Sequence, residues 1–210
     1  YYRELLQYAL TREDQPQQVL DAWKKSGARA MLFLGHNNTK NPLDALPILK
    51  KYDLRAIAEV EGPNEPNNKF PPQDLNHKYK GKTDEAATAQ YMQEFYEALK
   101  ADPQLKGLPV VAFSAIFTDY NLAKGHTGFD YGNIHSYQGY GVPSSSLEDN
   151  IVRFNNIHPP GAVIKPFVPT ETGYNVEADV SNGTFKHGSY RAQALNIPML
   201  LAEYFRHGIK

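Results

Sequence analysis

Residues 55–67 read Arg-Ala-Ile-Ala-Glu-Val-Glu-Gly-Pro-Asn-Glu-Pro-Asn, an apolar run that ends in a polar turn. The run from residue 54 to residue 60 is typical of a short buried strand, and Gly62 and Pro63 end it. Asn64 and Glu65 therefore follow directly at the C-terminal end of the predicted strand. Functional side chains of parallel α/β proteins collect at that end, so this stretch indicates both a fold class and a site.

A second stretch, residues 165–175, has the same organisation and reads Lys-Pro-Phe-Val-Pro-Thr-Glu-Thr-Gly-Tyr-Asn. Residues 166–169 are predicted to form a strand, and Glu171 follows it. Glu65 and Glu171 are therefore our candidate catalytic residues, because two carboxyl groups roughly 5–5.5 Å apart can perform glycoside hydrolysis with retention. Residues so far apart in the chain come that close only where a fold gathers strand ends, as a parallel α/β barrel does.

The rest of the chain alternates between predicted strands and helices, which favours a parallel sheet with right-handed crossovers. Ser189 begins the last helix, and Pro198 inside it predicts a kink or a local break. A polar, Pro-rich loop is expected at residues 67–82. The predicted helices are residues 15–26, 42–52, 83–100, 147–154 and 189–207, and the predicted strands are residues 28–34, 54–60, 108–117, 130–135 and 166–169.

The composition is that of one soluble globular domain spanning residues 1–210, with 41% hydrophobic and 21% charged residues. The net charge of −1 gives no electrostatic reason to expect a nucleic-acid partner. No apolar run reaches the ~18 residues of a membrane span. The absence of cysteine excludes disulfides and thiol catalysis. No signal peptide opens the chain at Tyr1; we expect a fragment of a longer, secreted or extracellular protein.

Further polar and aromatic side chains follow the predicted strands and are candidates for substrate binding. An amide such as that of Asn64 can contact a substrate hydroxyl, and a tyrosine can donate a hydrogen bond to a carboxylate. Glu61 is expected to support the site, whereas Asp119 and Asp130 are weaker candidates, since loop aspartates usually make turns. The candidate substrate-binding residues are His36, Asn64, His135, Tyr137 and Tyr174.

Three motifs in order resemble the clan A retaining glycoside hydrolases, which are (β/α)8 barrels. They are residues 62–66 (Gly-Pro-Asn-Glu-Pro), residues 135–137 (His-Ser-Tyr) and residues 170–174 (Thr-Glu-Thr-Gly-Tyr). In that clan the motifs end the fourth, sixth and seventh strands. The resemblance implies that Glu65 is the acid/base, Asn64 a contact to a 2-hydroxyl, and Glu171 the nucleophile.

On this register the chain supplies only the third to seventh strands, and no first, second or eighth strand is recognised. The resemblance covers residues 28–210. We therefore expect an incomplete barrel with exposed sheet edges at residues 28–34 and 166–169. The arginine that the clan often supplies from an early strand is not identified.

The leading hypothesis is a retaining β-glycosidase acting on a poly- or oligosaccharide without a cofactor or metal. A non-catalytic carbohydrate-binding barrel remnant is the alternative. A metal-dependent hydrolase using His36 and His135 is a third hypothesis, although the chain lacks His-x-His and His-Glu-x-x-His spacings. The sugar, the linkage, endo or exo action and the oligomeric state stay open.

Overall fold

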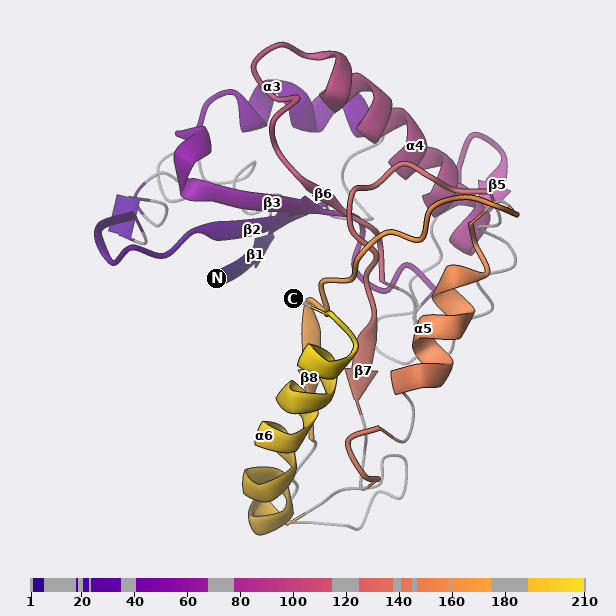
Figure 1. The fold of residues 1–210 in the computed structure, drawn as a ribbon. Coiled ribbons are helices and arrows are strands. Elements are labelled where there is room, and N and C mark those ends of the chain that lie inside the picture. The colour runs from indigo at the N-terminus through magenta and orange to yellow at the C-terminus, as the bar shows by residue number, and fades with distance from the viewer. Residues whose placement is uncertain are drawn as a thin grey trace.

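A parallel sheet forms the centre of the molecule (Figure 1). Its first four strands are β1 (Tyr2–Leu5), β2 (Ala30–Phe33), β3 (Ile57–Glu61) and β6 (Val110–Val111), hydrogen-bonded in that order and all parallel. The structure is a computed structural model, and it describes residues 2–5, 18, 21–22, 24–34, 41–67, 78–114, 125–137, 141–144, 147–158, 160–174 and 189–209.

Two isolated parallel bridges, Val111 to Tyr131 and Gly132 to Phe167, continue the arrangement toward a further parallel pair. That pair consists of β7 (His135–Tyr137) and β8 (Glu171–Gly173). Gly132 pairs with Phe167 and His135 pairs with Glu171, so three residue steps on one strand match four on the other. One extra residue of this kind acts as a β-bulge, which re-aims the side chains beside it.

Helices and short turns connect the strands, and the helices lie along the outside of the curved sheet (Figure 1). Their buried side chains, including Leu49, Phe95, Phe154 and Leu200, form one large core with the sheet. The elements are η1 (Pro42–Asp44), α3 (Ala45–Leu49), η2 (Leu54–Ala56), α4 (Asp84–Ala101), α5 (Leu147–Asn155) and α6 (Tyr190–Arg206), with an antiparallel pair β4 (Lys78–Tyr79) and β5 (Lys82–Thr83) before α4.

The opposite face of the sheet carries a small apolar cluster of Met31, Val111 and Val168. Glu61 is fully buried at the end of β3, and its register partner on β6 is Val111. Parallel strands with both faces covered explain why β3 is buried on successive residues instead of alternately. This inner face ends in the polar groups that form the candidate site.

The prediction of helices near residues 83–100, 147–154 and 189–207 is confirmed within one or two residues at each end. In the predicted helix at residues 15–26, the described residues 18, 21–22 and 24–25 are helical. The last helix runs through Pro198 as one element, so the alternative of a local break there was wrong. Of the strand predicted at residues 108–117, the described residues 108–114 form a strand at Val110–Val111, and residues 115–117 lie outside the described part of the chain.

One prediction about the sheet was wrong. We expected an exposed edge at residues 28–34, but β1 pairs with β2 along all four of its residues, from Tyr2 with Ala30 to Leu5 with Phe33. The segment Tyr-Arg-Glu-Leu is short and mixes polar with apolar side chains, so it gives no periodic signal. In the ranges that the structure covers, β1 and β8 each pair with a single neighbouring strand, and the sheet does not close into a barrel.

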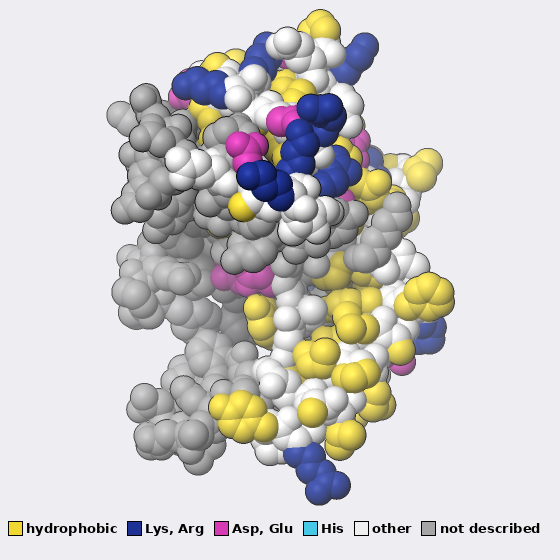
Figure 2. All heavy atoms as spheres, turned by 90° about the vertical axis from the view of Figure 1, so that its left-hand side faces the viewer, with side chains coloured by type: hydrophobic (Ala, Val, Ile, Leu, Met, Phe, Trp, Pro, Cys, Tyr) yellow, Lys and Arg dark blue, Asp and Glu magenta, His cyan; other side chains and the backbone are white. Residues whose placement is uncertain are grey.

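The outer face of α6 is apolar, with Leu195, Met199, Leu201 and Phe205 exposed. Figure 2 shows hydrophobic side chains gathered in its lower half, on the side of the molecule where α6 lies. Among the described helices, none combines the length and the hydropathy that crossing a bilayer requires.

Candidate active site

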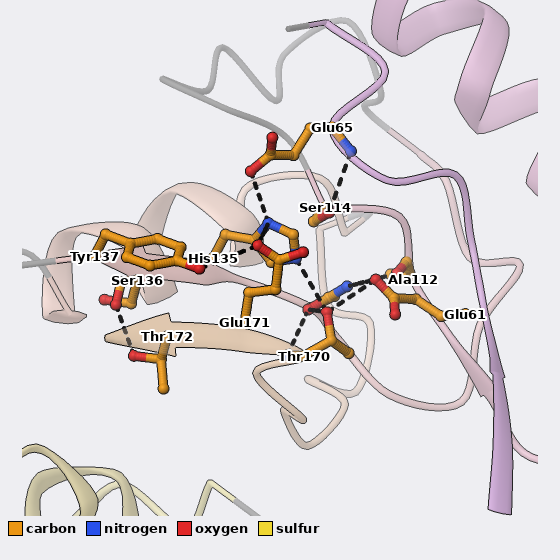
Figure 3. Close-up of polar contacts among 11 residues, drawn as sticks. Glu61, Glu65, Ala112, Ser114, His135, Ser136, Tyr137, Thr170, Glu171 and Thr172 are labelled. Atoms are coloured by element: carbon orange, nitrogen blue, oxygen red, sulfur yellow. Dashed lines mark hydrogen bonds and ion pairs between the residues drawn. The ribbon is translucent and has the colours of Figure 1, made fainter. Parts of the chain in front are cut away.

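Two register partners, His135 on β7 and Glu171 on β8, form the floor of the site (Figure 3). Register partners in a parallel pair present their side chains on the same face of the sheet. The distance from His135 Nδ1 to Glu171 Oε2 is 3.7 Å. Ser136 and Thr172 point to the opposite face, where Thr172 Oγ1 donates to the Ser136 carbonyl (2.7 Å) and contacts the Tyr204 hydroxyl of α6.

Glu65 reaches the same point from the turn after β3. Its φ of 43° places it in the left-handed region, which a side chain other than glycine rarely occupies. Its backbone N–H donates to Ser114 Oγ at 3.4 Å, and its Oε1 lies 2.9 Å from His135 Nδ1. A strained conformation of this kind costs of order 1–3 kcal/mol and is characteristic of functional turns.

The three groups converge closely. One oxygen of Glu65, one oxygen of Glu171 and one ring nitrogen of His135 all lie within 4.8 Å of one another. The His135 side chain is 3% exposed, whereas those of Glu65 and Glu171 are 16% and 28% exposed. The ring is therefore held inside the protein, while both carboxyl groups remain accessible to a substrate. Two carboxylates and an imidazole at this spacing are also chemically able to ligate a divalent cation.

A buried polar network lies beneath His135. Thr170 Oγ1 is 3.0 Å from His135 Nε2, 2.8 Å from Glu61 Oε1 and 3.1 Å from Asn133 Oδ1. Asn133 Nδ2 donates to Glu61 Oε1 (3.0 Å) and to the Ala112 carbonyl (3.1 Å), and Asn133 Oδ1 accepts from Thr170 N (3.2 Å). The network thus links the end of β3 with His135 of β7 and with Thr170, the residue directly before β8.

The tyrosines of the predicted site have different environments. Tyr137 is about half exposed, and its hydroxyl donates to Glu171 Oε2 at 3.2 Å. Tyr174 is buried in the core, and burial raises the pKa of its hydroxyl. Within the described residues the donor to Glu171 is Tyr137, and the expected donation from Tyr174 is not seen. The burial of Tyr174 favours a packing role over contact with substrate.

The other predicted residues separate into three groups. Asn64 is half-buried beside Glu65. His36 and Asp119 lie outside the described residues. Asp130 lies away from this site: it accepts from the Tyr96 hydroxyl (3.0 Å) and the Val110 N–H (2.8 Å) and pairs with Lys100 (2.8 Å), which ties α4 to β6.

Sequence reasoning missed Thr170 and Asn133 as members of the site and assigned Glu61 only a supporting role. Thr170 directly precedes Glu171, and Asn133 stands two residues before His135, so proximity to the candidates was the available signal. Their contacts depend on which strands become neighbours, which short sequence patterns do not encode.

Comparisons with proteins of known structure find similar folds among glycoside hydrolases and a glucanosyltransferase. An active-site mutant of the Rhizomucor miehei β-1,3-glucanosyltransferase in complex with laminaritriose is similar with a TM-score of 0.65 and 16% identity, over 99% of this chain and 71% of that one. A family 39 glycoside hydrolase from Bacteroides cellulosilyticus is similar with a TM-score of 0.59 and 14% identity, over 99% of this chain and 48% of that one. The Bifidobacterium dentium β-glucuronidase complexed with coumarin-3-O-glucuronide is similar with a TM-score of 0.61 and 17% identity, over 98% of this chain and 32% of that one.

At these identities the likeness shows the fold: this chain has part of the TIM-barrel architecture that the glycosidases share. No family model matches the sequence. No curated protein matches it either.

Proposed function

We propose that the protein is a retaining glycoside hydrolase of clan A that cleaves β-glycosidic bonds of a poly- or oligosaccharide. The observation that carries the proposal is the approach of Glu65 and Glu171, one carboxylate oxygen of each lying within 4.8 Å of the other. Inverting enzymes hold their two carboxyl groups about 6.5–9.5 Å apart to admit a water molecule between base and sugar. The shorter separation here favours direct attack by a carboxylate. The glycosidase folds of the similar structures add support at the level of architecture.

In the first step a Glu171 oxygen attacks the anomeric carbon while the bond to the leaving oxygen breaks. Glu65 delivers its proton to that oxygen, which leaves as an alcohol. In the second step Glu65, now a carboxylate, takes a proton from water, whose oxygen attacks the same carbon. The ester to Glu171 breaks, and Glu65 regains its proton. Two displacements at one carbon retain the β configuration.

The surroundings suit each role. Glu171 must be an oriented, ionised nucleophile, and the Tyr137 hydroxyl donates to one of its oxygens. Glu65 must exchange a proton, and its Oε1 contacts the imidazole of His135. Asn64 next to Glu65 offers an amide to the substrate, in the role of a 2-hydroxyl contact. His36 stays a proposed substrate contact on sequence grounds alone.

Azide rescue tests the two roles separately. Glu65→Gln should retain the first step for aryl β-glycosides with acidic leaving groups, and added azide should intercept the intermediate to give a β-glycosyl azide. Glu171→Ala should form no intermediate, and azide should displace the leaving group directly to give an α-glycosyl azide. An α-azide from Glu65→Gln and a β-azide from Glu171→Ala would mean that Glu65 is the nucleophile and Glu171 the acid/base. Wild-type rates in both variants would refute the proposal.

Two further arms separate the alternatives. Dialysis against a chelator should leave hydrolysis unchanged, since neither step uses a metal; loss of activity restored by Zn²⁺ would support a metal-dependent hydrolase. Binding of oligosaccharides with no turnover in any substrate screen would support a carbohydrate-binding remnant. Laminaritriose is a suitable first probe, because it is bound by the similar β-1,3-glucanosyltransferase. Products longer than the trisaccharide would show that a sugar replaces water in the second step.

We also propose that the enzyme acts outside the cell, because polysaccharides are too large to cross a membrane unaided. Fractionation of the source organism should place the activity in the medium or at the cell surface. Recovery of the activity only in the cell lysate would contradict this localisation.

A further inference from the structure

We propose that Thr170 is a positioning residue that keeps a proton on Nε2 of His135, so that Nδ1 is the nitrogen that exchanges a proton with Glu65. Thr170 Oγ1 lies 3.0 Å from that Nε2, on the side of the ring away from the two candidate catalytic carboxyl groups (Figure 3). The catalytic consequence rests on the proposed function of Glu65, whereas the position of the proton does not.

The argument begins with the single proton of a threonine hydroxyl. Glu61 Oε1 lies 2.8 Å and Asn133 Oδ1 lies 3.1 Å from Thr170 Oγ1, and both are hydrogen-bond acceptors. Glu61 and Asn133 are fully buried, so directing the hydroxyl proton elsewhere would weaken the pairing of a buried carboxylate. The proton therefore points toward these acceptors, and a lone pair of Oγ1 is left for the ring of His135.

An acceptor at 3.0 Å from Nε2 requires an N–H on that nitrogen. The arrangement does not depend on the charge of Glu61, because Asn133 Oδ1 can accept the hydroxyl proton if Glu61 is protonated. The Asn133 amide is itself oriented, since its Nδ2 donates to both Glu61 and the Ala112 carbonyl. The contacts of Thr170 with Glu61 and Asn133 thus keep the imidazole proton of His135 on Nε2.

The opposite nitrogen then faces the chemistry. His135 Nδ1 is 2.9 Å from Glu65 Oε1 and 3.7 Å from Glu171 Oε2, so only Glu65 is at hydrogen-bond distance. A neutral ring with its proton on Nε2 offers Nδ1 as an acceptor for the carboxyl proton of Glu65. A charged ring donates from Nδ1 to the Glu65 carboxylate. The two states differ by the transfer of one proton between Oε1 and Nδ1, with no other bond changed.

The test reads the ring nitrogens of His135 directly by long-range ¹H–¹⁵N correlation NMR, with no substrate present. The chain has 7 histidines, and His135→Gln identifies the relevant signals by their loss. Thr170→Val removes the hydroxyl with little change of shape, and Thr170→Ser keeps it. Thr172→Val is the matched control, because it removes a hydroxyl only two residues further along the chain, and that hydroxyl contacts Ser136 and Tyr204 instead of His135.

When the pH is raised until the ring is neutral, we expect the remaining proton on Nε2 in the wild type, Thr170→Ser and Thr172→Val. In Thr170→Val the hydroxyl acceptor at 3.0 Å from Nε2 is removed, whereas Glu65 Oε1 still lies 2.9 Å from Nδ1, so the proton should move to Nδ1. A wild-type ring protonated on Nδ1, or a Thr170→Val spectrum equal to that of the wild type, would overturn the proposal.

Kinetics then connect the tautomer with the reaction. Thr170→Val should lower kcat for substrates with poor leaving groups by up to about 10²-fold, the lower end of what acid–base catalysis contributes, and Thr170→Ser should restore it. Substrates with acidic leaving groups should be nearly unaffected in their first step. A further outcome is that the ring proton moves to Nδ1 in Thr170→Val while the wild type hydrolyses no substrate. That result would refute the proposed function and leave the positioning role of Thr170 supported.

Discussion

Tyr137 and Glu171 are joined by a hydrogen bond of 3.2 Å across β7 and β8, although the register partner of Tyr137 is Gly173. The bond is therefore diagonal along the parallel pair. A Cβ atom at position 173 would lie 3.6 Å from Tyr137 Cε1, so the tyrosine ring covers the glycine at van der Waals distance. The ring passes over this position to place its hydroxyl on the proposed nucleophile.

Tyr137→Phe tests this contact. A hydrogen bond to a charged group contributes about 1.5–3 kcal/mol, and the exposure of Tyr137 reduces that value, so we expect kcat/KM to fall about five- to tenfold. The measurement is steady-state hydrolysis of an aryl glycoside. Tyr190→Phe is the control, because Tyr190 is highly exposed on α6. An unchanged kcat/KM for Tyr137→Phe, or an equal loss for Tyr190→Phe, would remove Tyr137 from the mechanism.

Gly62→Ala should disturb the turn that carries Asn64 and Glu65. An added Cβ would lie 2.7 Å from Phe113 N and 2.8 Å from Met92 Sδ, because the end of β3 lies directly against the segment that follows β6. Overpacking of this kind costs about 1–3 kcal/mol, and it should shift Glu65 and lower activity as well. Urea unfolding and hydrolysis rates measure the two effects.

Gly107→Ala provides the comparison for this prediction. Nothing lies within 4 Å of a Cβ atom at that position, so stability and activity should both stay near the wild-type values. Equal behaviour of the two alanine variants would show that the close approach at Gly62 is relieved without moving the turn.

The buried ring of His126 should make stability fall as the pH is lowered. Burial, with a smaller contribution from Lys165 and then His158, lowers its pKa from 6.5 to about 3. Neither ring nitrogen has a hydrogen-bond partner among the described residues, and the ring packs between Phe113 and Phe129. Above pH 6.5 the ring is neutral in both states, and below that value the unfolded chain binds the additional proton.

The free energy of unfolding should therefore decrease by up to about 1.4 kcal/mol per pH unit between pH 6.5 and about 3 on account of this one group. His158 acts in the same direction, because burial also lowers its pKa. His126→Phe should flatten the dependence, measured as the difference between wild-type and variant urea unfolding at each pH. Parallel curves would show that His126 is not the group responsible.

Local sequence determined much of the architecture of this protein. The apolar run that ends at Gly62 predicts a strand with a polar C-terminal end, because a buried strand needs only a few consecutive apolar residues. The strand predicted at residues 166–169 is reduced to a single bridge at Phe167, and β8 begins at Glu171 instead of ending before it. The long helix α4 was visible from its apolar periodicity, and the final helix α6 was predicted between Ser189 and His207. The sequence also indicated that Glu65, His135 and Glu171 lie at one edge, since the ends of parallel strands share it.

Tertiary structure alone decided how those residues contact one another. The pairing of β1 with β2, the extra residue between Phe167 and Glu171, and the burial of Tyr174 all depend on which segments become neighbours. The contact of Thr170 with Glu61 and His135 joins the residue directly before β8 to β3 and β7. Strand patterns fix which side chains reach an edge, whereas hydrogen-bond partners a few ångströms apart are set only when the strands are assembled in register.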